Sequence, residues 1–181
     1  MAIIDRLYEE FLRVTNRSNV EEDRAKYCLE VAIGLLEEET GIKLRKAEVE
    51  EEFVVPVASY IYTPGYMPIN EIIEIIDRNG FSVEPITIKR GLVTTRVLIG
   101  GVGIYKIRYM AGFISDEDTD LSKIPYVIRE GIYHIGEWIY EKWQRGLIAL
   151  EERNEFGGAT ALKDFDEYIK GIIRKIGIND V

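Results

Sequence analysis

Apolar side chains recur at three- and four-residue intervals in the first forty residues, which is the pattern of amphipathic helices. The first series, which includes Ile3 and Leu7 with charged residues between them, predicts a helix over 2–15. After a polar break, a second series predicts a helix over 19–40. Gly41 should end this helix, because glycine readily takes the left-handed conformation that follows a helix.

Between residues 42 and 113 the pattern changes to β-branched and aromatic runs interrupted by glycine and proline. Such runs are typical of strands and turns, so this section is predicted to be mostly sheet. Ile69–Ile76 also fits helical spacing, but the run is short, rich in isoleucine and bounded by turns, and we interpret it as a strand. Val93–Ile99 and Ile104–Tyr109 flank a glycine-rich turn and predict a hairpin.

A third helical pattern follows Pro125, which stands where the first turn of a helix accepts proline. This helix is predicted over 124–146, and its apolar residues cover an unusually wide arc. Beyond a flexible glycine pair, residues 151–181 predict a C-terminal helical arm. We therefore divide the chain into a main domain, 1–150, and this arm.

The order of these elements predicts an α+β fold. A helical bundle should carry a small antiparallel sheet between its second helix and the proline-led helix, with the C-terminal arm added. The 181 residues include 46% hydrophobic and 30% charged side chains, which is the composition of a globular protein. A chain of this length can bury its own core without disulfides or a structural metal.

The single cysteine, Cys28, excludes an intramolecular disulfide and a cysteine-based zinc cluster, and fits a reducing compartment. Acidic residues near the N-terminus argue against a signal peptide, and no uncharged stretch is long enough for a membrane helix. We expect a soluble protein with no membrane partner. Its formal net charge of −9 has the wrong sign for general affinity to DNA phosphates.

The only histidine, His134, could share one helix face with Glu130 and Glu137 as metal ligands. No second histidine and no cysteine lies nearby, so we favour a partly buried histidine on an interface helix. A metal-dependent enzyme using these three residues stays as an alternative.

A repeat of aspartates, Asp116, Asp118 and Asp120, resembles the start of a calcium loop. The position that requires glycine is Leu121, and the position of the bidentate glutamate is Val127. This segment is therefore interpreted as a solvated loop.

No motif supplies a catalytic nucleophile. The glycines of Gly100–Gly103 lack the third glycine of a dinucleotide site and precede a predicted strand, and Cys28 lies on the inward stripe of its helix. We predict a non-enzymatic protein with no cofactor and no metal.

Apolar excess on the helices is the positive signal. Tyrosine and tryptophan are enriched at protein interfaces because they bury a large area while one polar end stays satisfied. The residues predicted to make packing or subunit contacts are Tyr133, Trp138, Tyr140 and Trp143 on the proline-led helix, and Phe165, Ile169 and Ile173 on the arm.

Four motifs over roughly residues 20–145 occur in an order that resembles a known family. They are the Thr40-Gly41 step that ends a helix, the proline-containing hydrophobic segment Met67–Ile75, the Tyr-x-Ala-Gly-aromatic segment Tyr109–Phe113, and the proline-led helix Ile124–Ile132 with its ending Trp138–Glu141. The family is that of the head-to-tail connector, or adaptor, proteins of tailed bacteriophages.

This resemblance implies a structural virion protein rather than an enzyme. Such a protein docks as a ring beneath the dodecameric portal protein, extends the DNA channel, and receives the tail or other neck proteins. It would be assembled in the host cytoplasm and reside in the neck of the virion, and DNA would pass through it without specific binding. A small cytoplasmic homo-oligomeric binding module, with no virion role, stays as an alternative.

The acidity of the chain is compatible with a DNA channel. A wall of carboxylates would repel phosphates and avoid the salt-dependent affinity that a basic wall creates. The candidate channel-lining residues are Glu48, Glu50, Glu51, Glu52, Asp116, Asp118 and Asp120.

Overall fold

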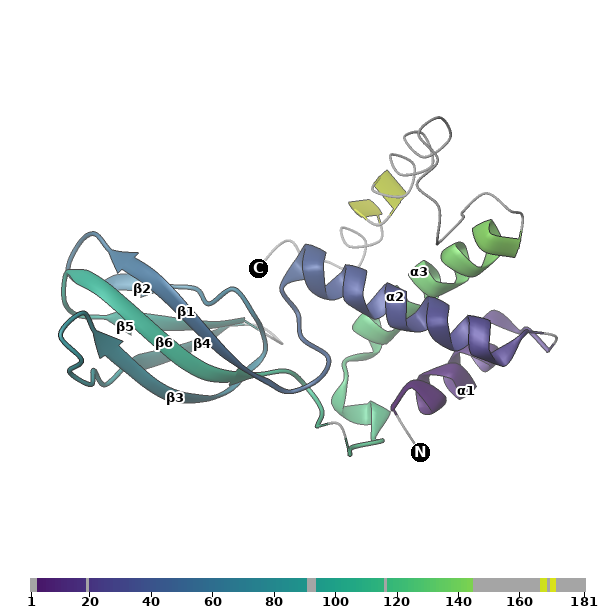
Figure 1. Cartoon of the computed structure of the whole chain (residues 1–181), viewed down its shortest axis with the longest axis horizontal. Coiled ribbons are helices and arrows are strands. Elements are labelled where there is room, and N and C mark those ends of the chain that lie inside the picture. The colour runs from purple at the N-terminus through teal and green to yellow at the C-terminus, as the bar shows by residue number, and fades with distance from the viewer. Residues whose placement is uncertain are drawn as a thin grey trace. The chain divides into compact units, whose positions relative to one another are not determined.

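The computed structural model of the chain is shown in Figure 1. It describes residues 3–18, 20–90, 94–115, 117–144, 167–168 and 170–171. The described residues form two compact units. The helical unit takes in the residues up to Thr40 and those from Glu117 onward, whereas the sheet unit is the insert Gly41–Asp116.

The helical unit consists of three α-helices and one short 3-10 helix. These are α1 (Ile3–Thr15), α2 (Glu22–Thr40), the 3-10 helix η1 (Leu121–Lys123) and α3 (Tyr126–Gln144). Each apolar stripe seen in the sequence is turned toward the other helices. The hydrophobic residues of this core with no exposed surface are Leu7, Leu29, Ala32, Leu36, Ile132 and Ile135.

A close contact between α2 and α3 lies at Gly136. A Cβ atom at Gly136 would lie 2.9 Å from Cδ2 of Leu29, so only glycine lets the two helices meet at this point without displacing that side chain. Gly41 has a φ of 68° and directly follows α2, as the sequence predicts. A Cβ there would lie 2.2 Å from the carbonyl oxygen of Gly65.

The sheet unit contains two three-stranded antiparallel sheets. The first has the order β1-β6-β3 and the second β2-β5-β4. The strands are β1 (Ala47–Val55), β2 (Tyr60–Tyr62), β3 (Ile69–Asp77), β4 (Ile86–Arg90), β5 (Thr94–Ile99) and β6 (Gly103–Ala111).

Both sheets contribute to one hydrophobic core. Phe53, Ile75 and Ile107 come from the first sheet, and Val97 and Ile99 come from the second. Alternate residues of each strand therefore point into the shared core, and the residues between them form two outward faces.

The strand over Ile69–Ile76 is confirmed, but the hairpin expected from Val93–Ile99 and Ile104–Tyr109 is wrong. β5 pairs with β2 and β4, whereas β6 pairs with β1 and β3. The glycine-rich turn carries the chain from one sheet to the other. Both strands then direct their apolar side chains into the same core from two different sheets.

The α+β class predicted from the sequence is confirmed, with the strand region inserted between the second helix and the proline-led helix. The insert holds two small antiparallel sheets rather than one. Of the C-terminal arm, only Glu167, Tyr168, Lys170 and Gly171 are described, and they are helical. The boundary predicted at residue 150 lies outside the described residues. None of the described helices combines the length and the hydropathy that crossing a membrane requires.

Candidate functional site

Two of the predicted interface tyrosines on α3 pack inside the helical unit. Tyr133 is 1% exposed and Tyr140 is 3% exposed. The ring of Tyr133 lies 6.3 Å from that of Phe11 on α1. The hydroxyl of Tyr140 accepts a hydrogen bond from the backbone N–H of Glu21 at 3.2 Å. Both side chains thus bind α3 to the other helices of the same chain.

The two tryptophans of α3 are partly exposed and have aromatic neighbours. Trp143 meets the edge of Tyr27 at 5.9 Å, and the guanidinium of Arg24 lies 5.0 Å from the Trp143 ring centroid. Trp138 stacks on Tyr168, with ring centroids 5.4 Å apart. The described part of the arm therefore contacts α3 of its own chain. Phe165, Ile169 and Ile173 lie outside the described residues.

Two groups of ion pairs connect α3 to the N-terminal part of the chain. The Arg129 guanidinium binds the Glu10 carboxylate, and both side chains are mostly buried, with 15% and 14% of their surface exposed. Arg17 pairs with Glu137 at 3.0 Å and also with Glu141. Neither group is visible in the sequence pattern, because the partners are more than a hundred residues apart.

The predicted metal ligands are not assembled into a site. His134 is exposed, and its Nε2 atom lies 3.8 Å from the Glu130 carboxylate. Glu137, the third candidate, accepts two hydrogen bonds from Arg17 instead. Within the described part of the chain, no three metal-ligating side chains lie close enough to hold an ion. The geometry thus gives no support to the metal-dependent enzyme.

The two described aspartates of the aspartate loop, Asp118 and Asp120, accept hydrogen bonds from residues of the same segment. Asp118 accepts a hydrogen bond from the Asp120 backbone at 3.0 Å and pairs with Lys123. Asp120 accepts two hydrogen bonds from Ser122, which lower the pKa of its carboxyl, and it caps η1. Asp116 is outside the described residues. The two described aspartates therefore stabilise the loop locally.

The glutamates of β1 are divided between two sides of the strand. Glu48, Glu50 and Glu52 point outward, whereas Glu51 lies on the side of the buried Phe53. A strand alternates its side chains, so these four residues cannot line one surface.

The outward side of β1-β6-β3, here named the acidic face, brings together more charges than the sequence run suggests. Register places Glu71 and Glu74 of β3 on the same side as Lys106 and Arg108 of β6. Arg108 joins the two edge strands, at 3.4 Å from Glu48 and 3.0 Å from Glu74, and Lys106 lies 3.5 Å from Glu50. Exposed pairs of this kind contribute little to stability. The acidic face carries five glutamates and two cations: Glu48, Glu50, Glu52, Glu71, Glu74, Lys106 and Arg108.

Glu51 has a structural task on the other side of the sheet. Its carboxylate accepts hydrogen bonds from the hydroxyls of Tyr62 and Tyr109 and from the backbone N–H of Gly65 at 3.1 Å. The Tyr109 hydroxyl also accepts the N–H of Tyr66 at 3.1 Å. Burial, followed by these bonds to Glu51, raises the pKa of both tyrosines. Glu51 therefore holds the loop that follows β2.

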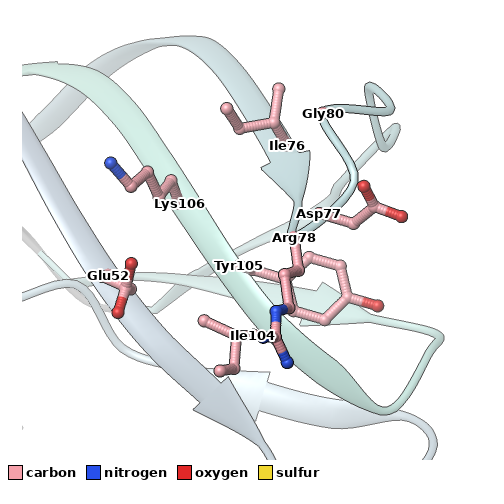
Figure 2. Close-up of a pocket in the computed structure, with 8 residues that line it drawn as sticks. All are labelled: Glu52, Ile76, Asp77, Arg78, Gly80, Ile104, Tyr105 and Lys106. Carbon is pink, nitrogen blue, oxygen red and sulfur yellow. The ribbon is translucent and has the colours of Figure 1, made fainter.

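A pocket of about 240 Å³ opens at one end of the acidic face, as Figure 2 shows. Its polar lining consists of two carboxylates, Glu52 and Asp77, and two cations, Arg78 and Lys106. Because these charges balance, the pocket has no strong preference for an anion or a cation. Its apolar lining residues are Ile76, Ile104 and Tyr105, with Gly80 at the rim.

Comparison with known proteins gives matches among solved structures. No family model matches the sequence, and no curated protein matches it. One chain of the neck of an empty gene transfer agent (GTA) particle, computed with C6 symmetry, is 16% identical with a TM-score of 0.50. The match covers 69% of this chain and 70% of that chain. The chain has the fold of a GTA neck protein.

A second match extends this finding. A chain of the virion of a native GTA particle is also 16% identical with a TM-score of 0.50, over 68% of this chain and 69% of that one. At this identity the likeness concerns the fold, and it supports the resemblance to neck connectors drawn from the sequence motifs.

Proposed function

We propose that this chain is a structural protein of the neck of a tailed, phage-like particle. It joins the head to the tail as an adaptor that docks on the portal ring and continues the DNA channel. The observation that carries the proposal is the fold shared with a chain of a GTA neck. The order of the four sequence motifs indicates the same class of protein independently, because it is a property of the sequence alone.

The proposed adaptor acts as a ring and without catalysis. The neck that contains the similar chain was computed with C6 symmetry. Cyclic symmetry requires each subunit to offer two different surfaces to its two neighbours. The resemblance to connectors puts the number of subunits at twelve, the symmetry of the portal.

The charge of the chain supports passage of DNA without adhesion. The charge that repels DNA, however, is carried by a different part of the molecule from the glutamate run first expected to line the channel. The insert Gly41–Asp116 contains nine acidic and nine basic residues, so the net charge of −9 belongs to the helical segments. Of the candidate lining residues, Glu51 is turned inward, and Glu48, Glu50 and Asp118 are paired with cations. We propose that the acidic helical unit supplies the repulsion toward phosphates.

Deleting the gene for this chain from the particle that encodes it tests the function. We expect DNA-filled heads and free tails that do not join, seen by electron microscopy, and joined particles when an intact copy is supplied. As a second readout, the protein should be found by mass spectrometry in purified joined particles. Normal joined particles in the deletion strain would contradict the proposal.

A further inference from the structure

The outward side of the second sheet carries an unpartnered apolar row. Register places Leu98 of β5 directly between Ile61 of β2 and Ile86 of β4. Directly opposed residues of antiparallel strands share one face, and the neighbouring Val97 and Ile99 point into the core. Ile61 is 46% exposed and Ile86 is 62% exposed. We name these three side chains the apolar row.

The positively charged side chain of Arg96 lies beside the apolar row. Arg96 is two residues before Leu98 on β5 and therefore lies on the same outward side. Its Nε atom is shielded from solvent and has no hydrogen-bond partner within the described part of the chain. A shielded donor without a partner is unfavourable by itself. Arg96 as a residue is partly exposed, so its positive charge can attract a carboxylate of another subunit.

One end of the acidic face of the first sheet has features that complement the apolar row and Arg96. Val54 of β1 pairs directly with Ile104 of β6, and Val54 is 63% exposed. We name these two residues the apolar pair. Two positions further along β1 lies Glu52, which is exposed and has no ion pair among the described residues. Glu52 and Ile104 both line the pocket in Figure 2.

The two faces present the same order of features along the same direction. Residues 56–59, between β1 and β2, and 100–102, between β5 and β6, form the turns at one end of the sheet unit. The apolar row and the apolar pair lie next to these turns, and Arg96 and Glu52 each lie two residues further away. The outward face of the second sheet in one copy can therefore lie on the acidic face of another copy, with both sheet units pointing the same way.

Such a contact is the kind that a ring needs. The two faces lie on opposite sides of the shared core, so each copy can hold one neighbour on each side. A head-to-tail contact between two different faces, repeated with all copies pointing in one direction, closes into a ring when the rotation allows it.

We propose that copies of this chain join through their sheet units, with the apolar row and Arg96 of one copy packed on the apolar pair and Glu52 of the next. The inference rests on the proposed function, since it names the contact that builds the ring of neck subunits. The contact brings the positive charge of Arg96 to the carboxylate of Glu52, and the exposed isoleucines and Val54 leave water.

Charge reversal provides the test, because the two charges belong to different faces. Arg96→Glu alone and Glu52→Arg alone should each raise the protein concentration at which oligomers form by about tenfold or more, because like charges then meet at every contact. An equimolar mixture of the two variants should assemble again. Every contact in an alternating ring then joins opposite charges, so native mass spectrometry should show even-numbered rings with the two variants in a 1:1 ratio.

Matched variants separate this contact from general effects of charge. Arg13→Glu and Glu38→Arg change exposed positions of the helical unit and should leave assembly as in the wild type. Ile86→Asp provides a second disruption at an exposed position, where the subunit itself should tolerate the change. Circular dichroism should show that all variants remain folded.

Three results would overturn the inference. They are assembly of the single variants as in the wild type, failure of the folded variants to recover when mixed, and a wild-type chain that stays monomeric at its highest soluble concentration. Rings that survive in Arg96→Glu and Glu52→Arg would show a different contact and leave the neck function standing. Absence of the wild-type chain from joined particles would count against the neck function itself.

Discussion

The hydroxyl of Tyr140 on α3 accepts the backbone N–H of Glu21, the residue that directly precedes α2, at 3.2 Å. The first N–H groups of a helix have no acceptor within the helix, and a side chain from another element supplies one here. The start of α2 therefore depends on α3, which is more than a hundred residues away in the chain.

Tyr140→Phe should lower the free energy of unfolding by about 1 kcal/mol, because it removes this hydrogen bond from a buried position and keeps the ring. Urea unfolding followed by helical circular dichroism measures the change. Tyr126→Phe, on the same helix with a ring that is 55% exposed, is the matched control and should change little. Equal effects in both variants would contradict the assigned role of the Tyr140 hydroxyl.

Gly136→Ala should destabilise the helical unit by about 1–3 kcal/mol, since its Cβ would lie 2.9 Å from Cδ2 of Leu29 and displace this side chain within the packed core. Gly34→Ala offers the opposite case on α2, because nothing lies within 4 Å of a Cβ there. That change should stabilise the chain by about 0.5–1 kcal/mol through helix propensity. Thermal unfolding compares the two, and a stabilising Gly136→Ala would disprove the close packing.

Glu10→Gln should cost about 3 kcal/mol, because it leaves the mostly buried Arg129 guanidinium without its counter-charge. Replacing both partners, with Glu10→Leu and Arg129→Met, should recover much of this loss. Glu9→Gln in the exposed pair with Arg6 is the control and should change little. Additive losses in the double variant, measured by urea unfolding, would mean that the buried pair is not coupled.

The tyrosines bound to Glu51 predict a loss of stability at alkaline pH. Burial and the bonds to Glu51 raise the pKa of Tyr62 and Tyr109 above the ordinary 10.0 in the folded chain. As the pH rises through about 10, these tyrosines ionise first in the unfolded chain, so the unfolded state binds fewer protons and stability falls.

The double variant Tyr62→Phe and Tyr109→Phe removes both titrating hydroxyls. The urea midpoint of the wild type should fall more steeply between about pH 9 and pH 11 than that of the variant. Tyr126→Phe again serves as the control, with the wild-type slope. Identical slopes in all three proteins would show that the two hydroxyls are not protected by the fold.

Local pattern predicted the elements well where periodicity was strong and turns were marked by glycine or proline. The three helices and the strand over Ile69–Ile76 are present, and Gly41 ends its helix with a positive φ of 68°. The hairpin between β5 and β6 was wrong, because alternation shows that a strand has one apolar side but not which strand lies next to it.

The surface assignments from sequence depended on information that only the coordinates contain. The aromatic stripe on α3 was compatible with packing or with subunit contacts, and the structure shows Tyr133 and Tyr140 packed within the helical unit. A run of glutamates looked like one acidic surface, yet Glu51 is separated from its neighbours by the alternation of the strand. The register of β4 and β5, which places Ile86 beside Leu98, could not be read from either strand alone.

The sequence by itself determined the α+β class, the inserted sheet region, the net charge and the resemblance to neck connectors, because these follow from local periodicity, composition and motif order. Only the tertiary structure decided which residues lie on the outward faces of the sheets and which are buried. Pairing across strands and burial between helices depend on contacts between residues far apart in the chain, and hydrophobic pattern specifies an inward side without specifying what it meets. Arg96 and Glu52 become candidates for one contact only after the two sheets have folded around their shared core.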